Sequence, residues 1–118
     1  MVDITTLENT NIIHTRIAQK ISAEDYEQMI PIINQMVDKY GSVRWIYELI
    51  DEPGIEPEAI WKDAKTSFSN LTNFDKVALI ASRDWLKKAT NIGDAITPFD
   101  MKYFESHQRQ KAIDWIKK

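Results

Sequence analysis

Residues 43–50 read VRWIYELI, and this stretch decides the fold more than any other part of the chain. Its apolar residues are almost continuous, which is typical of a central strand covered on both faces. Turn-forming residues DEPG follow at 51–54, and a second apolar run, VALIA, occupies 77–81. A helical pattern separates the two runs, so we expect two parallel strands joined by a right-handed helical crossover.

The sequence before this stretch predicts a β-hairpin and a long helix. Strands are expected over 4–7 and 12–21, because turn-forming residues separate two runs of β-forming residues. Apolar residues then recur at helical spacing over 23–40. Ser22 suits the N-cap of this helix, and Gly41 suits a left-handed cap at its end.

The sequence after this stretch predicts three more helices and a short strand. One helix is expected to begin at Pro57 and to carry Trp61. A second is capped by Ser82, a strand covers 101–104, and a last helix is capped by Ser106.

Together the elements follow the order β-β-α-β-α-β-α-β-α. They predict a single α/β domain over residues 1–118, with a mixed, mostly parallel five-stranded sheet flanked by four helices.

Composition narrows the class of protein. A chain of 118 residues with 43% hydrophobic and 28% charged residues has the size and composition of one globular domain. A net charge of -3 provides no field that would attract nucleic acid. No apolar run approaches the ~20 residues of a membrane-spanning helix, and the N-terminus does not resemble a secretion signal. We therefore expect a cytoplasmic protein, either a monomer or a weak homodimer.

The residues needed for common catalytic sites are missing or isolated. The chain has no cysteine and only two histidines, His14 and His107, which stand far apart in the sequence. With three glycines it cannot build a glycine-rich phosphate-binding loop in the usual way. We therefore expect no catalysis, no catalytic residue, no metal and no cofactor.

Acidic and aromatic residues each allow two interpretations. The acids within 51–58 could hold a hard cation, but acids are also common at helix N-termini. Tryptophans at helical spacing could line an apolar pocket or simply fill the core. The last helix, with Trp115, Lys117 and Lys118, could lie on an anionic membrane surface or pack on the sheet with a solvated basic end.

Several short motifs stand in a recognisable order. They are VRWIYE at 43–48, WKD at 61–63, FDKVALI at 74–80, Trp85, MKYF at 101–104 and AIDWI at 112–116. In this order they resemble the SpoIIAA-like proteins of bacteria. The resemblance covers nearly the whole chain. It implies a fold related to STAS domains, the anti-sigma-factor antagonists, and more distantly to lipid-carrying CRAL-TRIO domains.

Two positions depart from these relatives. Where members of the family often read Val-Gly-Asp after the fourth strand, residues 80–82 read IAS. Where anti-sigma antagonists carry a phosphorylated serine, residues 55–58 read IEPE and contain no hydroxyl group. Phosphorylation at that place is impossible, so any switching of partners would need another mechanism.

The resemblance implies a binding module for a hydrophobic ligand or lipid, or for a membrane surface such as the inner membrane. Its ligand is expected at the carboxyl ends of the strands, against Trp61 and Trp85, with Ser82 holding a polar head group. Glu48 and Asp51 are expected nearby, where their charge would disfavour anions. The alternative is a regulator that binds a partner protein, as anti-sigma antagonists do.

Overall fold

The computed structural model describes residues 2–18, 22–51, 73–91 and 100–118. In this part of the chain five strands form one sheet in the order β1-β2-β3-β4-β5. The strands are β1 (Val2–Thr6), β2 (Ile12–Ala18), β3 (Val43–Asp51), β4 (Phe74–Ala81) and β5 (Asp100–Glu105). The helices are α1 (Ala23–Tyr40), α3 (Arg83–Asn91) and α4 (Arg109–Lys117), with a 3-10 turn, η2 (Ser106–Gln108), before α4.

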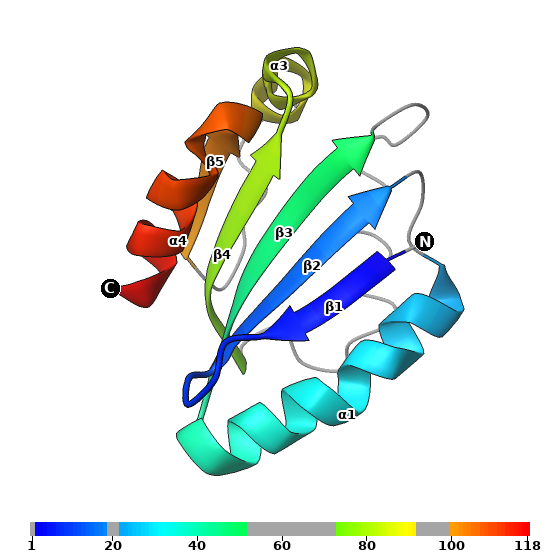
Figure 1. Cartoon of the computed structure of the whole chain (residues 1–118), viewed down its shortest axis with the longest axis vertical. Helices are drawn as coiled ribbons and strands as arrows, with labels where there is room; N and C mark the ends of the chain where they lie inside the picture. The colour runs from blue at the N-terminus through cyan, green and yellow to red at the C-terminus, as the bar shows by residue number, and fades with distance from the viewer. Residues whose placement is uncertain (1, 19–21, 52–72, 92–99) are drawn as a thin grey trace.

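The sheet has the mixed topology predicted from the sequence. β1 pairs with β2 in antiparallel fashion, whereas β2, β3, β4 and β5 run parallel to one another. Figure 1 shows the strands side by side in chain order, with β1 and β5 at the two edges. The α/β class and the mostly parallel five-stranded sheet are therefore confirmed. The described residues contain three of the four predicted helices, and the helix expected from Pro57 lies outside them.

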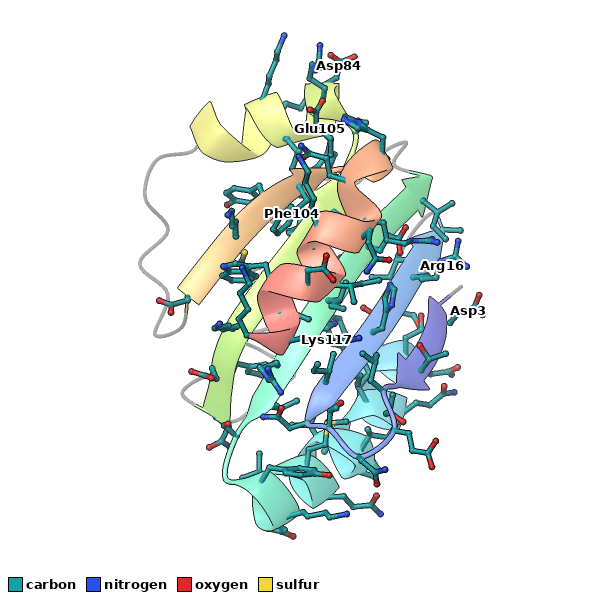
Figure 2. The ribbon with its side chains drawn as sticks, turned by 60° about the vertical axis from the view of Figure 1, so that its left-hand side comes forward. Asp3, Arg16, Asp84, Phe104, Glu105 and Lys117 are labelled. Carbon is teal, nitrogen blue, oxygen red and sulfur yellow. The ribbon has the colours of Figure 1, made fainter. Side chains whose placement is uncertain are left out.

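Each face of the sheet carries its own apolar core. α1 and Trp85 of α3 pack on one face, against alternate residues of β3 that include Trp45 and Tyr47. These two aromatic side chains are only 2% and 1% exposed, as the central position of the strand predicts. Ala112 and Ile116 of α4 pack on the other face. Figure 2 shows α4 lying across the sheet on that second face, with α1 behind it.

The predicted caps of α1 are both present. Ser22 Oγ accepts a hydrogen bond from the amide of Asp25, whose carboxylate in turn accepts one from the amide of Ser22. Pro31 is accommodated inside the helix. Gly41 ends it with a φ of 84°, in the left-handed region that glycine adopts most readily. Local sequence chemistry thus fixes where the polypeptide turns back to begin β3.

Several predicted boundaries need correction. β1 begins at Val2 rather than residue 4 and ends before Leu7, because the Leu7 carbonyl accepts the hydrogen bond that closes the following turn. β4 begins at Phe74 rather than residue 77, since that ring is buried 5.5 Å from the ring of Trp45.

Ser106 was expected to cap the last helix but instead opens the 3-10 turn η2. The reason is a competing cap: the Gln108 side chain accepts a hydrogen bond from the Glu105 amide at 3.0 Å. α4 therefore begins at Arg109, two residues later than a cap at Ser106 predicts.

Candidate functional site

A buried carboxylate on the central strand is the most unusual polar group of the described residues. Glu48 lies in β3 between Tyr47 and Leu49, both of which point into the core under α1. Because side chains alternate along a strand, Glu48 points to the opposite face, which carries α4. It is buried there. A buried carboxylate is costly unless cationic or hydrogen-bonding groups compensate it.

Three basic side chains surround Glu48, and we refer to Glu48, His14, Arg16 and Arg109 together as the Glu48 cluster. Arg109, the first residue of α4, donates from Nε and Nη2 to both carboxylate oxygens at 2.8–3.1 Å. The Nε2 atom of His14, on β2, lies 2.8 Å from Glu48 Oε1. Arg16, also on β2, brings its Nε to 3.7 Å from the same oxygen. The cluster therefore joins β2, β3 and α4.

Register explains why these residues meet. In the parallel pair β2–β3, His14 stands opposite Ile46 and Arg16 stands opposite Glu48. Side chains alternate between the two faces along each strand. In this register His14, Arg16 and Glu48 all point to the face that carries α4. The 3-10 turn after β5 brings Arg109 back over this face at the start of α4. The bidentate geometry of Arg109 is the strongest arrangement available to a guanidinium and a carboxylate.

The electrostatics of the cluster keep Glu48 ionised. Burial alone would raise the pKa of the carboxyl group, but hydrogen bonds from His14 and Arg109 outweigh it and lower the pKa to about 2. An ionised carboxylate can only accept hydrogen bonds, so the proton in the contact with His14 must reside on His14 Nε2. The cluster holds two arginines against one carboxylate, and Glu48 does not present an uncompensated negative charge.

Arg16 is incompletely satisfied within the cluster. His14 and Arg109 direct three N–H groups at the Glu48 carboxylate, and Arg16 makes no hydrogen bond to it. The Nε of Arg16 is buried and has no hydrogen-bond partner among the described residues. Its side chain is nevertheless 42% exposed, and that of Arg109 is 43% exposed. The cluster therefore carries positive charge toward the surface.

The sheet beside α4 is open in the described part of the structure. α4 lies over β3, β4 and β5, and none of the described helices covers β1 and β2 on this face. Figure 2 shows Arg16 and Asp3 here, on neighbouring strands at one side of the α4 helix. Asp3 stands opposite Arg16 in the antiparallel register of β1 and β2. The open face is therefore polar, with the Glu48 cluster along its boundary with α4.

The residues predicted to hold a ligand do not form one group. Trp85 is buried in the core on the α1 face, whereas Glu48 points to the α4 face. Ser82 Oγ accepts a hydrogen bond from the Trp85 amide at 3.2 Å, which confirms the predicted helix cap. Trp61 and the side chain of Asp51 lie outside the described residues, as do the acids that follow Asp51.

The C-terminal helix packs on the sheet through its aromatic residue. The Trp115 ring lies 6.1 Å from that of Phe104 on β5, and the Lys76 ammonium stands 5.2 Å from the centre of the Trp115 ring. Lys117 and Lys118 are exposed. No helix in the described ranges is both long and apolar enough to cross a membrane. Contact of this helix with a membrane surface stays a prediction.

The sequence contained a signal for the cluster that its interpretation missed. Glu48 interrupts an otherwise apolar central strand, and an acid there is rarely buried without a partner. His14 and Arg16 alternate along the neighbouring strand so that both side chains point to the face of Glu48, where they can act as its partners. Arg109 could not have been found in this way, because its position depends on the turn that precedes α4.

Comparisons with known proteins agree with this architecture. A family model described as SpoIIAA-like matches residues 12–117. The fold is similar to the crystal structure of an uncharacterized protein with a SpoIIAA-like fold from Shewanella loihica PV-4, with a TM-score of 0.63 and 24% identity. That similarity covers 98% of this chain and 92% of the other, and at this identity it bears on the fold alone. No curated protein matches the sequence.

Proposed function

The chain belongs to the SpoIIAA-like family, and from this premise we propose that it is a non-catalytic binding module for an amphiphilic ligand, one with an apolar body and a polar head. The observation that carries the proposal is the pairing of exposed apolar and cationic groups near the carboxyl end of β3. Ile50 is 51% exposed there, two residues beyond Glu48 in the same strand. Arg16 and Arg109 of the Glu48 cluster reach the surface close by.

The location supports a binding role on general grounds. In open α/β sheets, ligands usually bind beyond the carboxyl ends of the strands, where connecting segments meet. A large aliphatic side chain half exposed at that edge can contact an apolar ligand, and full burial of such a side chain contributes roughly 1.5–3 kcal/mol. The adjacent arginines can interact with the polar end of the same molecule.

The absence of catalysis is part of the proposal. His14 and Glu48 resemble the base and acid of a catalytic triad, but Glu48 is also held by both donors of Arg109. The hydroxyl of Thr5, which stands opposite His14 on β1, donates to the backbone carbonyl of His14. Thr15 is buried on the other face and accepts the indole N–H of Trp45. These contacts support a structural role for the His14–Glu48 pair.

The experiment is a titration of the purified protein with monomeric long-chain fatty acids and lysophospholipids, followed by tryptophan fluorescence. Ile50→Ser is expected to weaken binding roughly tenfold, about 1.4 kcal/mol, because it removes an apolar contact. Tyr40→Ser is the matched control, since Tyr40 is also a large and exposed side chain among the described residues, at 40%, and it lies at the end of α1. Equal affinities for both variants and the parent protein would contradict the location.

Two further variants locate the apolar body of the ligand. Trp85→Phe and Trp61→Phe are each expected to change the fluorescence response if those rings contact the ligand. Unchanged affinity and unchanged response in both variants would exclude the two tryptophans from the site and leave Ile50 as the proposed apolar contact. If no amphiphile binds and a protein partner is recovered instead, the regulatory alternative replaces the binding role.

A further inference from the structure

The Glu48 cluster has a cationic side that faces away from its carboxylate. We propose that Arg16 and Arg109 form a binding site for a phosphate group, either free or as a monoester. The proposal needs no apolar ligand, and it can hold or fail independently of the amphiphile-binding function.

The Nε of Arg16 makes no hydrogen bond within the cluster. Glu48 receives hydrogen bonds from His14 on one oxygen and from Arg109 on both, whereas Arg16 is too far from the carboxylate to donate one. Arg16 Nε stays 3.7 Å from the carboxylate, buried and without a hydrogen-bond partner in the described structure. A buried donor without a partner is unfavourable, so Glu48 holds Arg16 less firmly than it holds Arg109. The exposed part of the Arg16 side chain is therefore available to a ligand that supplies oxygen atoms.

The guanidinium groups of Arg16 and Arg109 meet at one oxygen of Glu48. Both approach the same oxygen, Glu48 Oε1, with the Nε of Arg109 at 3.1 Å and the Nε of Arg16 at 3.7 Å. Arg109 uses Nε and Nη2 for Glu48 and makes no contact through Nη1 among the described residues. Their side chains are both close to half exposed, so solvent can reach the remaining N–H groups.

Two arginines on different elements favour a tetrahedral anion over a planar one. A planar carboxylate is already satisfied by one arginine, as Glu48 itself shows with Arg109. A tetrahedral phosphate directs several oxygens outward and can accept from two guanidinium groups on different elements at once. With Glu48 ionised, the two arginines retain an excess of positive charge that such an anion would neutralise. A phosphate group therefore suits the site better than a carboxylate.

One acidic side chain opposes the ligand. Asp3 on β1 stands opposite Arg16 in the sheet register and is exposed. Figure 2 shows Asp3 and Arg16 on adjacent strands of the open face. No ion pair joins them among the described contacts, so Asp3 leaves the donors of Arg16 available while reducing the local positive potential. Removing its charge should strengthen phosphate binding.

The test is a titration with inorganic phosphate at constant ionic strength, adjusted with sodium chloride, in which NMR follows the side-chain N–H signals of the arginines. The parent protein is expected to show saturable shifts at Arg16 and Arg109. Arg16→Gln should weaken binding roughly tenfold or more, about 1.4 kcal/mol. Lys39→Gln, the same charge change at the end of α1, should leave the affinity within about twofold, because distant exposed charges are screened. Asp3→Asn should bind more tightly than the parent.

Two further arms identify the source of the phosphate. Glycerol 3-phosphate is used as a soluble monoester, and phosphatidylcholine vesicles with and without phosphatidic acid present the same group on a lipid. Arg16-dependent binding of the soluble monoester alone assigns the site to a soluble ligand, and added vesicle binding assigns it to a lipid head group. The proposal is overturned if phosphate produces no saturable shift at either arginine, or if Arg16→Gln and Asp3→Asn both bind phosphate as the parent does.

Discussion

Replacing Glu48 by glutamine is expected to destabilise the protein by about 3 kcal/mol at pH 7. The magnitude follows from the pKa of the Glu48 carboxyl group, which is about 2 in the folded protein against an ordinary value of 4.5. Each pKa unit corresponds to ~1.36 kcal/mol of preference for the ionised form. Small domains are stable by only ~5–15 kcal/mol, so this loss is large enough to measure.

The pH dependence gives the prediction its sign. Because folding lowers the pKa of Glu48, the stabilisation is fully present above pH 4.5 and is lost as the pH falls through about 2. Glutamine remains neutral throughout. The stability difference between parent and Glu48→Gln should therefore shrink steadily between about pH 5 and pH 2.

The assay is urea unfolding followed by tryptophan fluorescence at a series of pH values. Glu27→Gln on α1 is the matched control, since Glu27 is exposed and its replacement should change stability by less than about 0.5 kcal/mol. A difference between parent and Glu48→Gln that is the same at pH 7 and at pH 3 would refute the reasoning. So would a variant as stable as the parent at neutral pH.

Substitutions at two positions test the fold, and an activity screen tests the proposed lack of catalysis. Tyr47→Asp should abolish folding, because Tyr47 is buried and an unpaired buried charge costs several kcal/mol; normal thermal unfolding would contradict the central placement of β3. Gly41→Ala should lower the free energy of unfolding in urea by ~1–2 kcal/mol. The cause is the positive φ alone, since a Cβ there meets nothing within 4 Å. Gly41→Asn should lower it less, and equal losses of stability in the two variants would count against the positive φ as the cause. A screen with ester, phosphate and nucleotide substrates should show no turnover, whereas activity that disappears on mutating Asp51 or Glu52 would show that the protein is an enzyme.

The parts of the fold that follow from local sequence chemistry were predictable. The apolar run of β3 predicted that this strand lies at the centre of the sheet, and the predicted burial of Trp45 and Tyr47 is confirmed. Ser22 and Gly41 marked the ends of α1 because each satisfies a backbone requirement of a helix terminus. Such signals need only neighbouring residues, so they survive without knowledge of the rest of the structure.

The Glu48 cluster was not predictable to the same degree because it depends on contacts between distant segments. Glu48 was expected near Trp85, yet strand alternation places the two side chains on opposite faces of the sheet. Arg109 reaches Glu48 only because η2 precedes α4, and the competition between Ser106 and Gln108 for the cap decides that turn. A single sequence shows which strand residues share a face of the sheet. It does not show how η2 and α4 cross the face to which Glu48 points.

The central claim, that the protein is a binding module for an amphiphile, is tested most directly by native mass spectrometry of protein purified without detergent from the cells that express it. Lipids extracted from the same sample are identified in parallel. We expect a species heavier than the chain by the mass of one amphiphile, and a reduced amount of that species in Ile50→Ser but not in Tyr40→Ser. A spectrum with only the unliganded chain, in a sample that also fails to bind added fatty acid or lysophospholipid, would contradict it.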